Sequence, residues 1–221
     1  VRPFELMMGK IFGVASVAVV QVLIWAVLVC GAGAAVMPHV LPDGAMEAAA
    51  ALQQGGGAAT AAAGDFDPET LGAIALATDV GYLAMLFGYL LLFVVGGYLL
   101  YSAMFAAVGS AVDNAQDAAQ LQTPIMIPII LAVIVEMSVL NDPNSPLAFW
   151  FSLIPFTSPV VMMARIPYGI PTWEIVLSLV LLYAAFVGMV WLSAKIYRVG
   201  IFMYGKKPTL REMFRWIRYK Y

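Results

Sequence analysis

Long apolar stretches alternate with short polar ones along the chain, and this pattern predicts four membrane-spanning helices. The predicted spans are residues 11–36, 80–108, 124–140 and 173–194. A helix needs about 20 apolar residues to cross the hydrocarbon core of a bilayer, and the first two stretches exceed that length. Because lipid offers no partner for unpaired backbone groups, each span is expected to be helical. The predicted fold class is therefore an all-α membrane protein.

A polar stretch, residues 109–123, separates the second span from the third and is expected to be a loop in water. It carries Asp113, Asn114 and Asp117 but no basic residue. Both flanking helices would move with this loop, so we interpret it as a surface contacted by a soluble partner. The alternative is a solvated turn, whose residues are polar because they face water and not because they contact a partner.

Residues 146–164 are apolar but contain Pro155 and Pro159 in the middle of the segment. Proline removes a backbone donor and clashes with the preceding helical turn, so the two halves are too short to span. We predict a re-entrant or interfacial pair of short helices here.

Residues 37–79 differ in character from the spans on either side. They are acidic, lack Lys and Arg, and are rich in Ala and Gly in the middle. A short helix is predicted over 45–54, ended by the glycines that follow. Asp67 before Pro68 indicates a second helix start, and that helix can continue unbroken into the span that begins at residue 80.

The end of the chain, residues 206–221, predicts a basic amphipathic helix at the membrane surface. Thr209 and Glu212 have the spacing of a capping box. An apolar face opposite basic side chains suits an anionic lipid leaflet. The residues expected to contact the membrane surface are Arg211, Arg215, Trp216 and Arg218.

Composition and charge support this arrangement and orient it. Hydrophobic residues make up 63% of the chain and charged residues 11%, whereas charge is about a quarter of a soluble domain. Eight of the eleven Lys and Arg residues lie at or after Lys195. By the positive-inside rule the tail is cytoplasmic, which places 37–79 and 141–173 outside and 109–123 inside.

The sequence contains no recognisable catalytic set, so an enzyme is not predicted. It lacks a zinc-protease motif, a phosphate-binding glycine loop and clustered metal ligands, and it has one histidine and one cysteine. Energy from ATP would have to come from another chain.

Three residues inside the predicted spans are candidates for translocation or gating. Glu136 is an ionisable group within the third span, and such groups are costly and tend to face a cavity. A structural ion pair with Arg165, or a position near the interface, is the alternative. Tyr98 and Tyr101 could line a polar route or pack inside the bundle.

Three separated motifs carry a resemblance to a known family. They are PFELMMGKIFG (3–13), LLYSAMFAAVGSAVDNAQDAAQLQTPIMIP (99–128) and SVLNDPNSPLAFWFSLIPFTSPVVMMARIP (138–167). Together they resemble the membrane subunit of an ABC-2 type transporter, with most similarity to NatB-like, sodium-extrusion-type permeases. The likeness covers most of the chain except the Ala/Gly-rich segment. Because members of the family usually have six spans, the resemblance implies that this chain is the C-terminal portion of a longer permease.

The resemblance also implies a role and partners. The chain would export a substrate across the cytoplasmic membrane of a bacterium, paired with a second permease copy. ATP and Mg²⁺ would be bound by a separate ATPase subunit, with no cofactor and no nucleic acid on this chain. The residues expected to couple to that ATPase are Phe4 and Glu5 in a first segment, and Ser110, Asp113, Asn114 and Asp117 in a second.

Two other functional classes stay open at this point: an ATP-independent transporter or channel, and a structural subunit of a membrane complex. The former predicts more polar residues inside the spans and an internal repeat, and neither is found. The substrate is left open among sodium, drugs, peptides and lipids.

Overall fold

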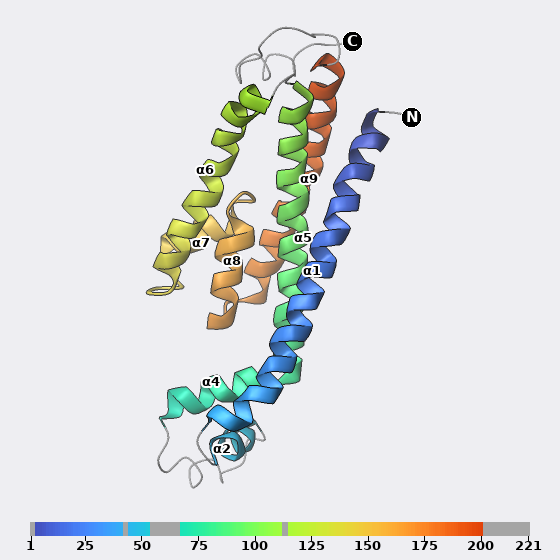
Figure 1. Cartoon of the computed structure of the whole chain (residues 1–221). Coiled ribbons are helices and arrows are strands. Elements are labelled where there is room, and N and C mark those ends of the chain that lie inside the picture. The colour runs from blue at the N-terminus through green and yellow to red at the C-terminus, as the bar shows by residue number, and fades with distance from the viewer. Residues whose placement is uncertain (1–2, 42–43, 54–66, 112–114, 201–221) are drawn as a thin grey trace. The chain divides into compact units, whose positions relative to one another are not determined.

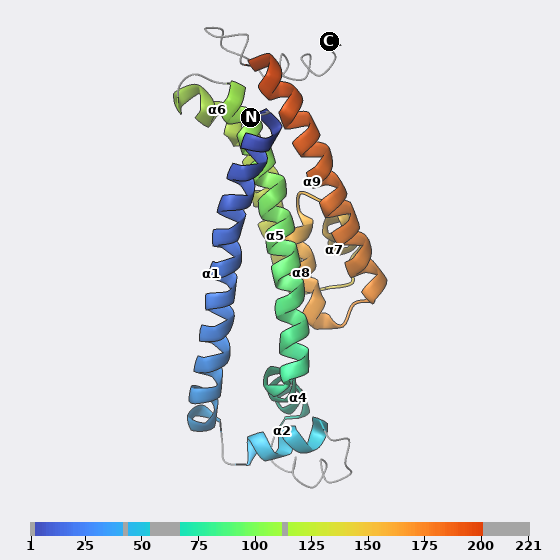
Figure 2. The same cartoon turned by 90° about the vertical axis from the view of Figure 1, so that its right-hand side faces the viewer.

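A computed structural model describes residues 3–41, 44–53, 67–111 and 115–200. Within these ranges the chain is helical apart from short connections and has no strand, which confirms the all-α class. The predicted tail helix, with Arg211, Arg215, Trp216 and Arg218, lies outside the described residues. The helices, shown in Figures 1 and 2, are α1 (Pro3–Val40), α2 (Ala45–Gln53), α4 (Pro68–Thr78), α5 (Val80–Ala111), α6 (Ala115–Val139), α7 (Pro146–Leu153), α8 (Ser158–Arg165), the 3₁₀ turn η1 (Ile166–Tyr168) and α9 (Thr172–Gly200).

Four of the described helices are long and apolar enough to cross a membrane. The apolar segments are Phe12–Val40, Val80–Gly109, Gln116–Val139 and Thr172–Ile196. These correspond to the four predicted spans, although the first helix continues four residues beyond the predicted end, through Pro38. Few of their side chains are buried within the chain, as expected for helices whose outer faces meet lipid.

Contacts divide the chain into two compact units. One contains residues 20–90, and the other contains residues 1–19 together with 91–221. The first unit contains the acidic stretch, residues 37–79. The second unit holds most of the motifs and the candidate site.

The larger unit is built from α5, α6 and α9, with α7 and α8 packed against α6 and α9 (Figure 1). The α7–α8 pair follows the end of α6 and leads back through η1 to the start of α9, so it enters and leaves at the same end. The two short helices form a hairpin, which confirms the helical pair predicted from Pro155 and Pro159.

Two apolar clusters hold α6 in place. Near its start, buried Leu121 and Ile125 pack with Ala107 and Val108 of α5 and Ile196 of α9. Toward its end, a second cluster joins α6 to the hairpin through Ala132, Val135 and Val139 of α6, Ala148 of α7 and Val161 of α8.

Helix α5 packs closely against its neighbours at a pair of glycines. A Cβ atom at Gly97 would lie 2.8 Å from Cγ of Pro159 in α8, and one at Gly96 would lie 2.7 Å from Cδ2 of Leu182 in α9. Small residues let helices approach in a membrane, where dispersion and hydrogen bonding drive association. Nearby, Ser193 of α9 donates a hydrogen bond to the Ala103 carbonyl of α5 at 2.6 Å.

The polar stretch predicted as a loop is mostly helical. Residues 109–111 are the last residues of α5, and residues 115–123 form the first turns of α6. Only 112–114 lie outside the described helices. The prediction of a 15-residue loop was therefore wrong, because polar side chains on a helix that extends into water need not break it.

The smaller unit contains a pair of short helices, α2 and α4. Ala45 and Ala49 of α2 are completely or almost completely buried against Ile74 and Ala75 of α4. Helix α2 matches the predicted helix over 45–54, and α4 begins at Pro68 with Asp67 at the N-cap, as predicted.

Helix α4 does not continue into the second span, contrary to the unbroken helix considered from the sequence. Asp79 has an extended backbone and ends α4. Its side-chain oxygen Oδ1 accepts hydrogen bonds from the backbone N–H groups of Gly81 (2.7 Å) and Tyr82 (3.2 Å). Asp79 therefore caps the start of α5, where the first N–H groups of a helix lack partners.

The glycine contacts predict unequal effects of the same substitution. Gly97→Ala would push a methyl group against the rigid Pro159 ring and lower the stability of the bundle by about 1–3 kcal/mol, the usual cost of overpacking. Gly96→Ala should cost less, because the atom it approaches most closely is the end of a flexible leucine side chain and not a proline ring. The measurement is the midpoint of thermal unfolding in detergent micelles.

Gly88→Ala is the matched control in the same helix, because an added Cβ there meets no atom within 4 Å. It should leave stability unchanged or raise it, through the better helix propensity of alanine. Equal effects at all three positions would show that α5 does not pack on α8 and α9 in this way.

Candidate functional site

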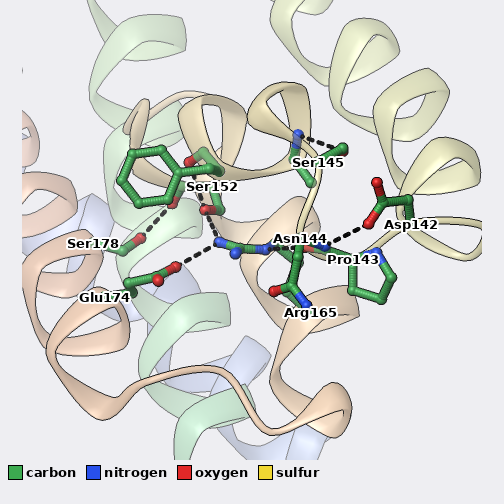
Figure 3. A network of polar contacts seen from close by, with 10 residues as sticks. Asp142, Pro143, Asn144, Ser145, Ser152, Arg165, Glu174 and Ser178 are labelled. Carbon is green, nitrogen blue, oxygen red and sulfur yellow. Dashed lines mark hydrogen bonds and ion pairs between the residues drawn. The ribbon is translucent and has the colours of Figure 1, made fainter.

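The centre of the larger unit is a buried arginine on α8. Arg165 has 2% of its side chain exposed, and its NH1 group lies 2.9 Å from Oε2 of Glu174 on α9. The same NH1 donates to Oγ of Ser152 on α7 at 2.6 Å, and Nε donates to the Pro143 carbonyl at 2.8 Å (Figure 3). One guanidinium thus joins α7, α8, α9 and the connection that follows α6.

Local sequence features place these groups. Ser145 caps α7 by accepting a hydrogen bond from the Ala148 N–H at 3.2 Å, with Pro146 at the first helical position. Asp142 accepts a hydrogen bond from the Asn144 N–H at 3.0 Å and shapes the turn that presents the Pro143 carbonyl. After α8, Gly169 has a positive φ of 72°, a conformation that favours glycine, and it turns the chain toward α9.

Charge pairing explains why the arginine can be buried. An isolated charge in a medium of low dielectric constant costs several kcal/mol, and hydrogen bonds to a counter-ion offset that cost. Glu174 supplies the negative charge and is itself nearly buried. The guanidinium also lies 6.0 Å from the centre of the Phe149 ring, which adds a cation–π contact.

Further hydrogen bonds attach the hairpin to the spans. Ser178 of α9, fully buried, donates to the Ser152 carbonyl at 2.7 Å (Figure 3). At the tip between α7 and α8, Tyr101 of α5 donates to the Phe156 carbonyl at 2.6 Å. Such bonds matter because a non-helical turn at membrane depth is tolerated only where its backbone groups find partners in the protein.

The ion pair considered from the sequence is not the one formed. Arg165 pairs with Glu174, not with Glu136. Glu136 is half-buried on α6, and its side chain has no hydrogen bond or ion pair with the residues that the structure describes. Its role in translocation or gating stays a prediction.

The other two candidates in the spans differ from each other. Tyr101 contributes to the site by its bond to the hairpin tip, which is a packing role and leaves its part in a polar route untested. Tyr98 is half-buried, one helical turn away. No hydrogen bond joins either tyrosine to Glu136 in the described part of the chain.

The predicted coupling residues are placed only in part. Phe4 and Glu5 lie in the first turns of α1 and Ser110 at the end of α5, but their side chains are outside the description. Asp113 and Asn114 lie outside the described residues altogether. Asp117 is in the first turn of α6, one turn before the buried Leu121.

Three residues of the site were not singled out from the sequence: Glu174, Ser152 and Ser178. The sequence does contain a feature that could have identified Glu174 as the partner of Arg165. Arg165 and Glu174 are the only charged residues between Asp142 and Lys195, and they flank a turn that contains Gly169. Opposite charges in that arrangement favour a pair.

Four helices able to span a membrane, with a pair of short helices fixed by a buried ion pair, define a multi-pass membrane protein. The family model described as "ABC-2 family transporter protein" matches residues 1–195. The chain therefore belongs to the ABC-2 transporter family and is a membrane permease of an ABC transporter. No curated protein and no solved structure matches it.

The ion pair predicts a distinctive pattern of stabilities. Glu174→Leu should lower the free energy of unfolding by about 3–5 kcal/mol, because it leaves Arg165 buried without a counter-charge. The double variant Arg165→Met with Glu174→Leu should be less damaging than Glu174→Leu alone, since no unpaired charge is then buried. Thermal unfolding in detergent micelles measures both.

Glu136→Gln serves as the control for this cycle. It should change stability by no more than about 0.5 kcal/mol, because it breaks no ion pair within the described chain. A loss as large as that of Glu174→Leu would mean that Arg165 depends on Glu136 in the membrane.

Proposed function

We propose that this permease couples ATP hydrolysis on a separate ABC ATPase subunit to export across the cytoplasmic membrane of a bacterium. The ATPase would contact the polar ends of α5 and α6 and the start of α1. A second permease copy would complete the transporter. ATP and Mg²⁺ would be bound by the partner chain.

The observation that supports this proposal is the packing of α6. Its polar first turns carry Asp117 and Gln120, and immediately after them Leu121 and Ile125 are buried against α5 and α9. A force applied to the start of α6 would therefore be transmitted to two other spans. A merely solvated turn between two helices would not need this buried contact.

The same helix also reaches the re-entrant hairpin. Leu121 and Val135 are 14 residues apart, which corresponds to roughly 21 Å along a helix. Because Val135 belongs to the cluster shared with α7 and α8, a tilt of α6 would shift the hairpin as well. We infer that α6 carries motion from the ATPase side of the membrane to the outer side.

The side chains at the two ends of α9 support the proposed orientation of the spans in the membrane. Trp173 at its start and Trp191 near its end are both exposed and lie 18 residues apart, roughly 27 Å along the axis. That spacing suits aromatic side chains at the two interfaces. Lys195 lies over the Trp191 ring, with Nζ 4.2 Å from its centre, on the side assigned to the cytoplasm.

A purification test can examine the coupling surface. The full-length protein is captured from its own cells in mild detergent, and the co-purifying proteins are identified by mass spectrometry. We expect an ABC ATPase in about equal amount. Asp117→Arg and Gln120→Arg should each reduce its recovery, because both introduce a bulky charge at the proposed contact.

Glu47→Arg is the matched control, since Glu47 is an exposed acid on α2, in the segment assigned to the opposite side of the membrane. It should leave recovery of the ATPase unchanged. Equal recovery with all variants would place the contact elsewhere. Absence of any ATPase from an intact complex would overturn the proposal and favour an ATP-independent transporter or a structural subunit.

A further inference from the structure

The unit formed by residues 20–90 contains a cavity of about 660 Å³ that the coupling role does not use. Four helices contribute to it. Gly33 and Met37 of α1, Met46 of α2, Thr78 of α4, and Val80 and Phe87 of α5 are among its lining residues. Its volume is within the range of small-molecule sites, about 300–1,000 Å³.

The lining is almost wholly apolar. Among the described residues that form it, Thr78 alone has a side-chain oxygen or nitrogen. The Thr78 hydroxyl lies 2.9 Å from the Ile74 carbonyl, to which it donates, and it accepts from Nε2 of Gln53 at 3.3 Å. With that hydroxyl engaged, the wall offers a ligand little beyond dispersion contact, and a water molecule inside would lack the two to four partners it needs.

The α5 side of the cavity lies at the depth of lipid tails, and its α2 and α4 side faces the interface. Asp79 caps the start of α5. Because a carboxylate avoids hydrocarbon, Asp79 marks the polar end of that span. The α5 residues that line the cavity extend from Val80 to Phe87, roughly 10 Å along the helix. This covers most of one leaflet, whose hydrocarbon half is about 15 Å thick.

We propose that this cavity binds one acyl chain of a phospholipid from the outer leaflet. At this depth the surrounding solvent is itself hydrocarbon, and an apolar recess with no water partners is filled most favourably by a chain of the same chemistry. Met37 and Met46 suit such a ligand, because their flexible, polarisable side chains adapt to irregular apolar shapes.

The absence of charge in the wall favours a phospholipid over a free fatty acid. A carboxylate buried in the cavity would need a cation, and no Lys or Arg occurs between Lys10 and Arg165. A phospholipid keeps its head group at the interface and inserts only its tail. The proposal is independent of whether the chain works with an ATPase.

Photo-crosslinking of lipid to the full-length protein tests this site. The protein is reconstituted in vesicles of phosphatidylethanolamine and phosphatidylglycerol, with added phosphatidylcholine carrying a diazirine near the end of one acyl chain. Adducts are located by peptide mass spectrometry. We expect adducts on the lining segments of α1 and α5, together with general adducts around Val27, which is 71% exposed and outside the cavity.

Two glycines on α1 provide matched variants. A Cβ added at Gly31 or at Gly33 meets no atom within 4 Å, and only Gly33 lines the cavity. Gly33→Leu should abolish the cavity adducts and leave those around Val27, whereas Gly31→Leu should leave both. Cavity adducts that are missing in the unmodified protein, or equal in the two variants, would overturn the proposal and indicate ordinary annular lipid.

Cys30 gives a second measurement that needs no substitution. It is the one cysteine in the sequence, it is exposed, and it lines the cavity. Alkylation with a bulky maleimide in detergent, before reconstitution, should fill the recess and remove the cavity adducts. Their persistence after complete alkylation would contradict binding at this site, even if Gly33→Leu proved unable to fold.

Discussion

The helical hairpin of this permease depends on one buried charge. Arg165 can remain inside the bundle only while Glu174, Ser152 and the Pro143 carbonyl are all within reach. These partners come from three different segments, so the position of α7, of α9 and of the turn after α6 is fixed by the needs of a single guanidinium. A buried pair of this kind is weak evidence for extra stability. Our hypothesis is that it specifies the arrangement, because a packing that separates Arg165 from Glu174 would leave a charge unpaired. The hairpin is thereby set in a defined position rather than merely pressed against the spans by its apolar surface.

Elsewhere the helices associate by means suited to lipid, where there is no hydrophobic gain from packing one apolar helix on another. Side-chain hydroxyls donate to backbone carbonyls of neighbouring segments: Ser178 to Ser152, Ser193 to Ala103 and Tyr101 to Phe156. The glycine pair on α5 permits close dispersion contact with α8 and α9. The two apolar clusters on α6 then connect the proposed ATPase side to the hairpin. Firm contacts therefore run along α5, α6 and α9, which is what a mechanically coupled permease needs.

The sequence predicted the spans well and the tertiary contacts poorly, for physical reasons. The length of an uncharged run is dictated by the thickness of the bilayer, so the four spans could be read directly. Pro155 and Pro159 interrupt an apolar segment too short to cross twice, which identified the helical pair. The polar start of α6 was taken for a loop, because helix and loop are equally compatible with polar residues in water. A pair between Arg165 and Glu136 was one of the alternatives considered, because Glu136 lies within a span. The choice of Glu174 depends on how Gly169 turns the chain, and a pattern of apolar residues does not encode that turn.

The order in which Arg165 and Glu174 occur along the chain has a consequence for how the protein is made. Arg165 emerges from the ribosome nine residues before Glu174, and Ser178 follows later still. During synthesis Arg165 therefore precedes its counter-ion along the chain. We expect the hairpin to reach its final packing only when α9 brings Glu174 beside Arg165, because an unpaired charge is costly to bury.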